Sequence, residues 1–128
     1  YDSSGDPAAV LTGTAGQVLT SAGSGNPPAF ATPTATTVPY NDWAIKTGTY
    51  TASNKDQLIA NSGSDFTITL PAGSAGNTVI ICNAGAGTVT VGRNGSQKIN
   101  SAAEDGTLAQ GASTQLVYVD DTIGWFQI

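Results

Sequence analysis

The sequence predicts an all-β protein, a small antiparallel β-sandwich or jelly-roll-like barrel preceded by an extended N-terminal arm. Three observations support this. Gly fills 16 of the 128 positions and only 10% of the residues are charged, so the long charged side chains that favour helices are scarce. Short β-type runs recur about every ten residues, separated by Gly, Asn, Asp and Ser. Residues 66–70 read Phe-Thr-Ile-Thr-Leu, the alternation of a strand with one buried face.

The strand pattern extends through the second part of the chain. Candidate strands are residues 48–52, 57–61, 66–70, 78–83, 88–93, 97–100, 106–109, 114–119 and 124–128. Asn94-Gly95 is the pair that a two-residue type I′ hairpin prefers, because both central residues need positive φ. Residues 120–124 are expected to form the turn between the last two strands. Residues 102–105 favour one helical turn at most.

The predicted core consists of the apolar residues that recur along these strands. They are Leu58, Ile59, Phe66, Ile68, Leu70, Val79, Ile81, Val89, Val91, Ile99, Leu108, Leu116, Tyr118, Trp125 and Ile128. The run Val79-Ile80-Ile81 is apolar on both sides, so alternation cannot decide which side faces inward. One side in the core and the other against a second subunit would account for it. The single cysteine, Cys82, is read as a small buried hydrophobe.

The first part of the chain, residues 1–42, has a different composition. It contains five of the six prolines and few large apolar side chains, too few to offset the entropy of ordering the segment alone. We therefore predict two parts: an extended Gly/Pro-rich arm or fibre-shaft segment over 1–42, and a β-sandwich domain over 43–128. The arm is expected to order against a partner through Val10, Leu11, Val18, Leu19 and Phe30. A flexible tether without a partner is the alternative.

The residue types exclude most catalytic chemistry. The chain has no His and one Cys, so Ser-His-Asp triads, Cys-His pairs and His-bearing zinc sites are impossible. Paired carboxylates at Glu104-Asp105 and Asp120-Asp121, with Asp56 and Asp65, are the only conceivable catalytic device. Adjacent acids point to opposite sides of a strand or are solvated in a turn. We therefore predict no enzyme, no cofactor and no metal site, with calcium in the Asp120-Asp121 turn as a minor alternative.

Charge and hydropathy limit the classes of partner that the chain can be expected to bind. The formal net charge is −5, with four scattered cations, so no basic surface for nucleic acid is expected. No run of 18 apolar residues exists, so no membrane insertion is predicted. The aromatic residues Tyr40, Trp43 and Tyr50 flank the junction between the two parts and are ambiguous between packing and sugar stacking. The first residue, Tyr1, suggests a processed or truncated start.

Residues 12–30 (Thr-Gly-Thr-Ala-Gly-Gln-Val-Leu-Thr-Ser-Ala-Gly-Ser-Gly-Asn-Pro-Pro-Ala-Phe) carry a resemblance to a known family. They resemble a GTxGQVLTSxGxGxxPxF element of tailed-phage virion structural proteins of the tail-fibre, head-fibre and capsid-decoration type. The later segments FTITLPA (66–72), VTVGRNGS (89–96) and LVY (116–118) with Gly124-Trp125 resemble a C-terminal module of such proteins.

The resemblance implies a homotrimeric, β-rich component at the surface of the virion, an extracellular particle. Its partners would be other virion proteins, the capsid or a fibre shaft, to which the arm anchors it. The alternative is the receptor-binding tip of a tail fibre that recognises a host-surface glycan or protein. The family has no shared catalytic residues to carry over.

Overall fold

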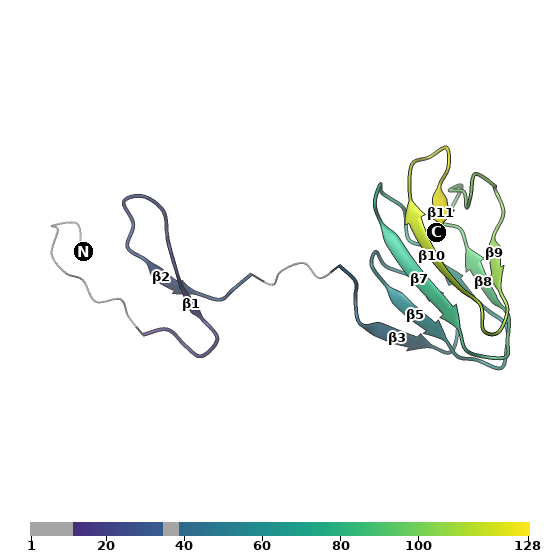
Figure 1. The fold of residues 1–128 in the computed structure, drawn as a ribbon, viewed down its shortest axis with the longest axis horizontal. Coiled ribbons are helices and arrows are strands. Elements are labelled where there is room, and N and C mark those ends of the chain that lie inside the picture. Colours follow the sequence, from purple (N-terminus) through teal and green to yellow (C-terminus); the bar gives the residue numbers. More distant parts are fainter. Residues whose placement is uncertain (1–11, 35–38) are drawn as a thin grey trace. The chain divides into compact units, whose positions relative to one another are not determined.

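The computed structural model describes residues 12–34 and 39–128. The chain divides into two compact units, Tyr1–Thr37 and Val38–Ile128 (Figure 1). The sequence placed this boundary after residue 42. The arm residues Val10 and Leu11 lie outside the described residues.

The first unit contains a two-stranded antiparallel hairpin in place of a uniformly extended arm. Strand β1 (Val18–Thr20) pairs with β2 (Ala29–Ala31), and residues 21–28 connect them. Leu19 lies opposite Phe30 in the register, and the Phe30 ring packs directly over the backbone of Gly13. The sequence did not predict this hairpin, because its strands are only three residues long and are separated by a loop rather than a tight turn.

The second unit is a β-sandwich, which confirms the predicted all-β class; no helix occurs in the two described ranges (Figure 1). The five-stranded sheet has the order β11 (Trp125–Gln127), β10 (Ser113–Tyr118), β7 (Thr78–Asn83), β5 (Gln57–Ala60) and β3 (Trp43–Lys46). The four-stranded sheet has the order β4 (Tyr50–Thr51), β6 (Phe66–Thr69), β8 (Val89–Gly92) and β9 (Gly106–Leu108).

The strand pairing differs from the predicted antiparallel pattern. From β3 to β8 the chain alternates between the two sheets, so β3, β5 and β7 pair in parallel on one side and β4, β6 and β8 in parallel on the other. Only β9, β10 and β11 join by antiparallel pairing. The turns carry the chain across to the opposite sheet rather than back along the same one. From β3 to β8, each strand therefore lies beside the strand two positions away in sequence, in the same direction.

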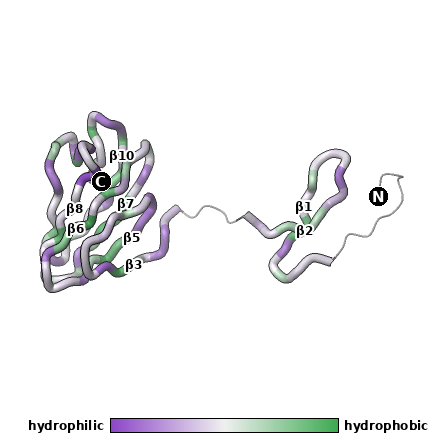
Figure 2. The backbone as a smooth tube through the Cα atoms, turned by 180° about the vertical axis from the view of Figure 1, so that it is seen from behind, coloured by the Kyte–Doolittle hydropathy of each residue, from purple (hydrophilic) through white to green (hydrophobic). Residues whose placement is uncertain are grey.

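The core lies between the two sheets, and in Figure 2 the strands of this unit are green along much of their length. The buried apolar residues are Ala52, Leu58, Ala60, Ile68, Leu70, Val79, Ile81, Val89, Val91, Leu108, Leu116, Tyr118 and Trp125. Phe66 and Ile99 are only partly buried against this set. Ile59 and Ile128 were wrongly placed in the core: Ile59 points to the outer side of β5, and Ile128 is 67% exposed.

Two details of the strand prediction are also wrong. Residues 97–100 form isolated bridges at Ile99 rather than a strand, and β3 was not foreseen. A turn does occur at Asn94-Gly95, but only Gly95 has positive φ (56°), so it is not a type I′ hairpin. The turn over 120–124 between β10 and β11 is confirmed, closed by the Gly124 N–H to Asp120 O hydrogen bond of 2.7 Å.

The loops that carry the chain from one sheet to the other pack directly against one another through their backbones. The Gly87 N–H donates to Ser62 O at 2.9 Å, and a Cβ on Gly87 would lie 2.3 Å from Ser64 O. The buried Asn83 amide ties the same region together: its Nδ2 donates to Gly87 O at 2.8 Å and to Leu108 O at 2.9 Å. The sequence Gly85-Ala86-Gly87 thus serves loop packing and not a phosphate-binding loop.

Candidate interaction surfaces

The outer side of the five-stranded sheet is an apolar face. The register places two rows of side chains across it, Trp43–Gln57–Ile80–Gln115 and Ile45–Ile59–Cys82–Ser113. Thr78, Val117 and Phe126 form a third row, and Ile128 follows on from β11. None of these side chains carries a charge. We call these twelve residues the apolar face.

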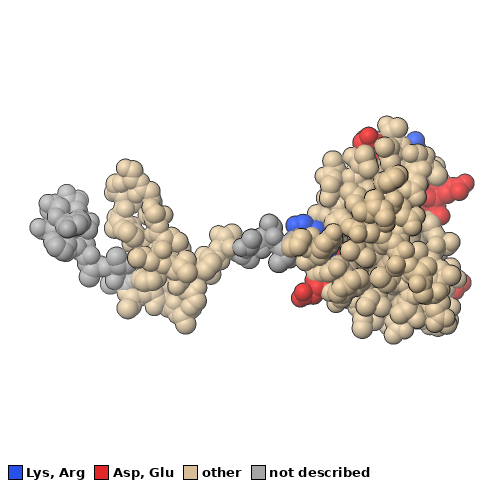
Figure 3. Space-filling model, in the orientation of Figure 1, with Lys and Arg blue, Asp and Glu red and all other residues tan. Residues whose placement is uncertain are grey.

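The large side chains at the two edges of the apolar face are well exposed, and Ile59, Ile80 and Val117 between them are half-buried. Trp43 is 49% exposed, Ile45 66%, Phe126 47% and Ile128 67%. In Figure 3 the charged side chains of this unit lie around its outline, and the middle of the view is uncharged. The exposed large hydrophobics among the described residues of the second unit thus gather mainly on one sheet.

Strand β7 has apolar side chains on both sides, which resolves the ambiguity left by the sequence. Val79 and Ile81 are buried between the sheets, and Ile80 and Cys82 point outward onto the apolar face. The prediction that Cys82 is a buried hydrophobe is therefore wrong, because its side chain is only half-buried. Alternation in a strand forces this result once its neighbour Ile81 points inward.

The outer side of the four-stranded sheet has a different chemistry. Thr67 lies beside Thr90 and Thr90 beside Thr107, and Thr51 lies beside Thr69. We call these five residues the threonine face. Their hydroxyl groups can hydrogen-bond water, whereas the side chains of the apolar face mostly cannot.

The hairpin of the first unit exposes three further large apolar side chains. Val18 is 47% exposed, Leu19 54% and Phe30 38%. An isolated two-stranded hairpin is marginally stable at best in water, because it has too little surface to bury. These three residues are therefore a second candidate contact surface, and they belong to the set that the sequence predicted for the arm.

Five of the carboxylates considered for catalysis accept hydrogen bonds from groups of the chain itself: Asp56, Asp65, Asp105, Asp120 and Asp121. Asp120 Oδ1 accepts the N–H groups of Thr122 and Ile123 in its own turn, both at 2.8 Å. Asp121 accepts the Tyr118 hydroxyl at 2.5 Å, and this hydrogen bond raises the pKa of Tyr118. The neighbouring acids Asp120 and Asp121 therefore bind different groups and do not form a paired site.

The remaining acids are separated in the same way. Asp105 accepts the backbone N–H and the side-chain Nε of Arg93, both at 3.0 Å, and these bonds lower the pKa of Asp105. Asp65 accepts the Thr88 N–H at 2.7 Å. Asp56 is 8% exposed and accepts from Asn41, Tyr50 and Ser53. Within residues 12–34 and 39–128 no cluster of three or more His, Cys, Asp or Glu side chains is placed to hold a metal ion.

The junction aromatics that the sequence left ambiguous separate in the structure. Tyr50 is half-buried, with its hydroxyl 3.3 Å from Asp56 Oδ2 and the Lys46 ammonium 3.6 Å from its ring centroid. Tyr40 is half-buried and accepts a hydrogen bond from Gln115 Nε2 at 3.1 Å. Trp43 alone is mainly exposed, and it lies on a strand of the apolar face rather than in a loop.

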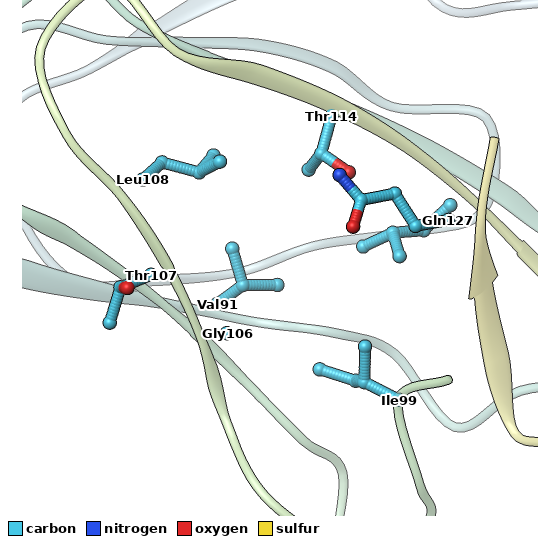
Figure 4. A pocket seen from close by; sticks show the side chains of 8 residues that line it. Val91, Ile99, Gly106, Thr107, Leu108, Thr114 and Gln127 are labelled. Carbon is cyan, nitrogen blue, oxygen red and sulfur yellow. The ribbon is translucent and has the colours of Figure 1, made fainter. Parts of the chain in front are cut away.

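A small cavity opens between the two sheets near β9 and β11 (Figure 4). Its volume is about 60 Å³, and Val91, Ile99, Leu108 and Leu116 supply its apolar lining, with Thr114 and Gln127 as polar neighbours. Sites for small organic ligands are typically about 300–1,000 Å³. The cavity has room for a few water molecules and is too small for a substrate.

A scan against protein-family models and a search of curated proteins each found no match to this chain. In the described part of the chain no helix is long and apolar enough to cross a bilayer. The two exposed apolar surfaces, on the hairpin and on the five-stranded sheet, are therefore the candidate sites for binding another protein.

Proposed function

We propose that this chain is a structural component of a tailed-phage virion, a homotrimeric capsid-decoration or fibre subunit anchored to neighbouring virion proteins by its N-terminal arm. On this proposal it catalyses no reaction and works at the surface of the particle. The observation that carries the proposal is the hairpin of the first unit, which exposes Val18, Leu19 and Phe30 and has little surface of its own to bury.

The hairpin coincides with the residues on which the resemblance to virion proteins rests. The glycines of that element have definite structural roles: Gly16, Gly23 and Gly25 have φ of 89°, 89° and 81°, and Gly13 lies beneath the Phe30 ring. Positive φ favours glycine because other residues meet steric strain there. The pattern thus encodes one folded element with an apolar pair, Leu19 and Phe30, which supports its use as an anchor.

A receptor-binding tip is less well supported by the distribution of aromatic side chains. Loops of a receptor tip should present several aromatics on one surface. Trp43 and Phe126, the exposed aromatics of the second unit, instead lie on strands of a sheet face. Such a location suits packing against a protein better than stacking on a sugar held in loops.

The test is binding of the labelled full chain to intact phage particles and to host cells. We expect binding to particles that lack this protein, weakened at least tenfold by Leu19→Glu, which buries a charge at the anchor. Ser24→Glu, on the exposed loop of the same hairpin, is the matched control and should bind normally. Binding to cells but not to particles would establish the receptor function instead, and binding to neither would refute both.

A further inference from the structure

We propose that a second copy of this chain covers the apolar face, so that copies associate through the outer side of the five-stranded sheet. This inference rests on the proposed function, which expects a homotrimer, and it names the surface through which the copies pack. Four properties of the described residues support it: the size of the face, the state of its polar groups, its charge, and its contrast with the opposite face.

The size of the apolar face is of the order that a subunit interface needs. Five strands of three to six residues, spaced about 4.8 Å apart and on average about 15 Å long, give a footprint of about 360 Å². The accessible area is larger, because Trp43, Ile45 and Ile128 stand half to two-thirds exposed above the sheet. Monomers rarely leave continuous apolar patches larger than a few hundred Å² uncovered, and a typical interface buries about 800 Å² on each partner.

Three polar groups of the face, on Gln57, Gln115 and Thr78, would lose little contact with water when the face is covered. Gln57 Nε2 donates to Asn41 O at 2.8 Å, and Gln115 Nε2 donates to the Tyr40 hydroxyl at 3.1 Å. The Thr78 hydroxyl oxygen is already buried, so covering it removes no further contact with solvent. Burying a polar group is costly mainly when it loses hydrogen bonds to water. Covering these three groups therefore carries a small desolvation penalty.

The absence of charge favours a copy of the chain over a charged partner. Each chain has a net charge of −5, so copies repel one another wherever their acidic groups approach. The apolar face is a side on which copies can meet around a three-fold axis without opposing like charges. A partner selected by charge complementarity would find no counterpart there, whereas apolar side chains pack against their own kind without complementary groups.

The threonine face is the internal contrast. Both faces are outer sides of sheets in the same sandwich, built by the same alternation of inward and outward residues. One presents threonine hydroxyls to solvent and the other presents Trp, Ile, Val and Phe. Strand structure alone requires neither choice, so the apolar composition of one side reflects what lies against it.

The test uses sedimentation velocity of the full chain across the micromolar range. Ile45→Glu and Phe126→Glu place a charge on the two edge strands of the five-stranded sheet. Thr51→Glu and Thr107→Glu do the same on the two edge strands of the four-stranded sheet and are the matched controls. All four positions are exposed, so each variant should fold, which near-UV circular dichroism checks. We expect Ile45→Glu and Phe126→Glu to weaken self-association at least tenfold. The two control variants should self-associate as strongly as the unaltered chain.

Cys82 supplies a second readout at the centre of the face. Its thiol lies between Ile59 and Ser113 in the register, and it is the only cysteine. A thiol reagent should react more slowly as the concentration of the unaltered chain, and hence the oligomer, increases. The Ile45→Glu variant should react at the monomer rate at every concentration.

The outcomes separate this inference from the function on which it rests. If Ile45→Glu and Phe126→Glu remain oligomeric and the Cys82 rate is independent of concentration, the apolar face is not the interface and the inference fails. Dissociation by Leu19→Glu in that case would assign the contact between copies to the hairpin. A chain that binds virions but stays monomeric overturns the inference and leaves the structural function standing.

Discussion

Asp56 is the residue that connects the start of the second unit to its first two turns. Its Oδ1 accepts Asn41 Nδ2 at 2.8 Å, and its Oδ2 accepts the Ser53 N–H at 2.8 Å and the Tyr50 hydroxyl at 3.3 Å. The carboxylate is nearly buried, yet its partners are hydrogen-bond donors without charge. A buried carboxylate is tolerated when several donors satisfy it.

Replacing this carboxylate should destabilise the sandwich markedly. We expect Asp56→Ala to lower the free energy of unfolding by about 3 kcal/mol, because three donors lose their acceptor in a partly buried site. Asp65→Ala is the control, since Asp65 is exposed and accepts only the Thr88 N–H; it should cost about 1 kcal/mol or less. Urea denaturation at one fixed protein concentration measures both. Equal losses would contradict the structural role given to Asp56.

At the scale of elements, close packing between successive loops determines whether the parallel strands of each sheet can pair. The loop that contains Gly87 lies against the loop over residues 62–64, with room for hydrogen but not for a methyl group. Parallel strands two positions apart in sequence can then pair on both sides of the core. The glycine requirement arises from contact between loops and not from the backbone angle, because Gly87 does not have positive φ.

A methyl group at this contact should force the two loops apart. We expect Gly87→Ala to lower the free energy of unfolding by at least about 2 kcal/mol, because its Cβ would lie 2.3 Å from Ser64 O. Gly63→Ala, in the facing loop, has open space around its Cβ and should be close to neutral. Thermal unfolding of both variants at matched concentration tests the comparison. A neutral Gly87→Ala would show that the loops do not approach this closely.

On the scale of the whole molecule, the boundary between the two units depends on residues that look like linker in sequence. The Asn41 N–H donates to Lys55 O at 2.9 Å, its side chain reaches Asp56, and its carbonyl accepts from Gln57. Tyr40 is hydrogen-bonded to Gln115 in the same way. Tyr40 and Asn41, which the composition assigned to the arm, therefore belong to the sandwich.

The two possible boundaries give chains of different stability. A chain of residues 39–128 keeps the hydrogen bonds of Tyr40 and Asn41, whereas a chain of residues 43–128 loses them. At about 1 kcal/mol for each hydrogen bond, the shorter chain should be less stable by about 2–4 kcal/mol. Chemical denaturation of the two fragments decides the matter. Equal stability would place the boundary after residue 42, as the composition suggested.

The candidate surfaces were only partly predictable. The sequence identified Val18, Leu19 and Phe30 as apolar residues without a core, and the structure exposes all three. The sequence also suggested that one side of β7 lies against a second subunit, but it could not show which other residues share that side of the sheet. That face joins Ile45, Ile80 and Phe126, which lie on strands far apart in the chain. Ile59 and Ile128 were assigned to the core, since an apolar residue in a strand looks the same whichever side it occupies.

The sequence by itself determined that this protein is built of short strands, where most of them lie, and which side chains alternate along each. These properties depend on neighbours in the chain, so local patterns such as Phe66 to Leu70 are sufficient to reveal them. Only the tertiary structure decided that strands pair in parallel and that Cys82 points outward. The parallel pairing depends on whether a turn crosses to the opposite sheet, which is settled by contacts between distant loops such as Gly87 on Ser62. The orientation of Cys82 depends on which side of β7 packs against the opposite sheet.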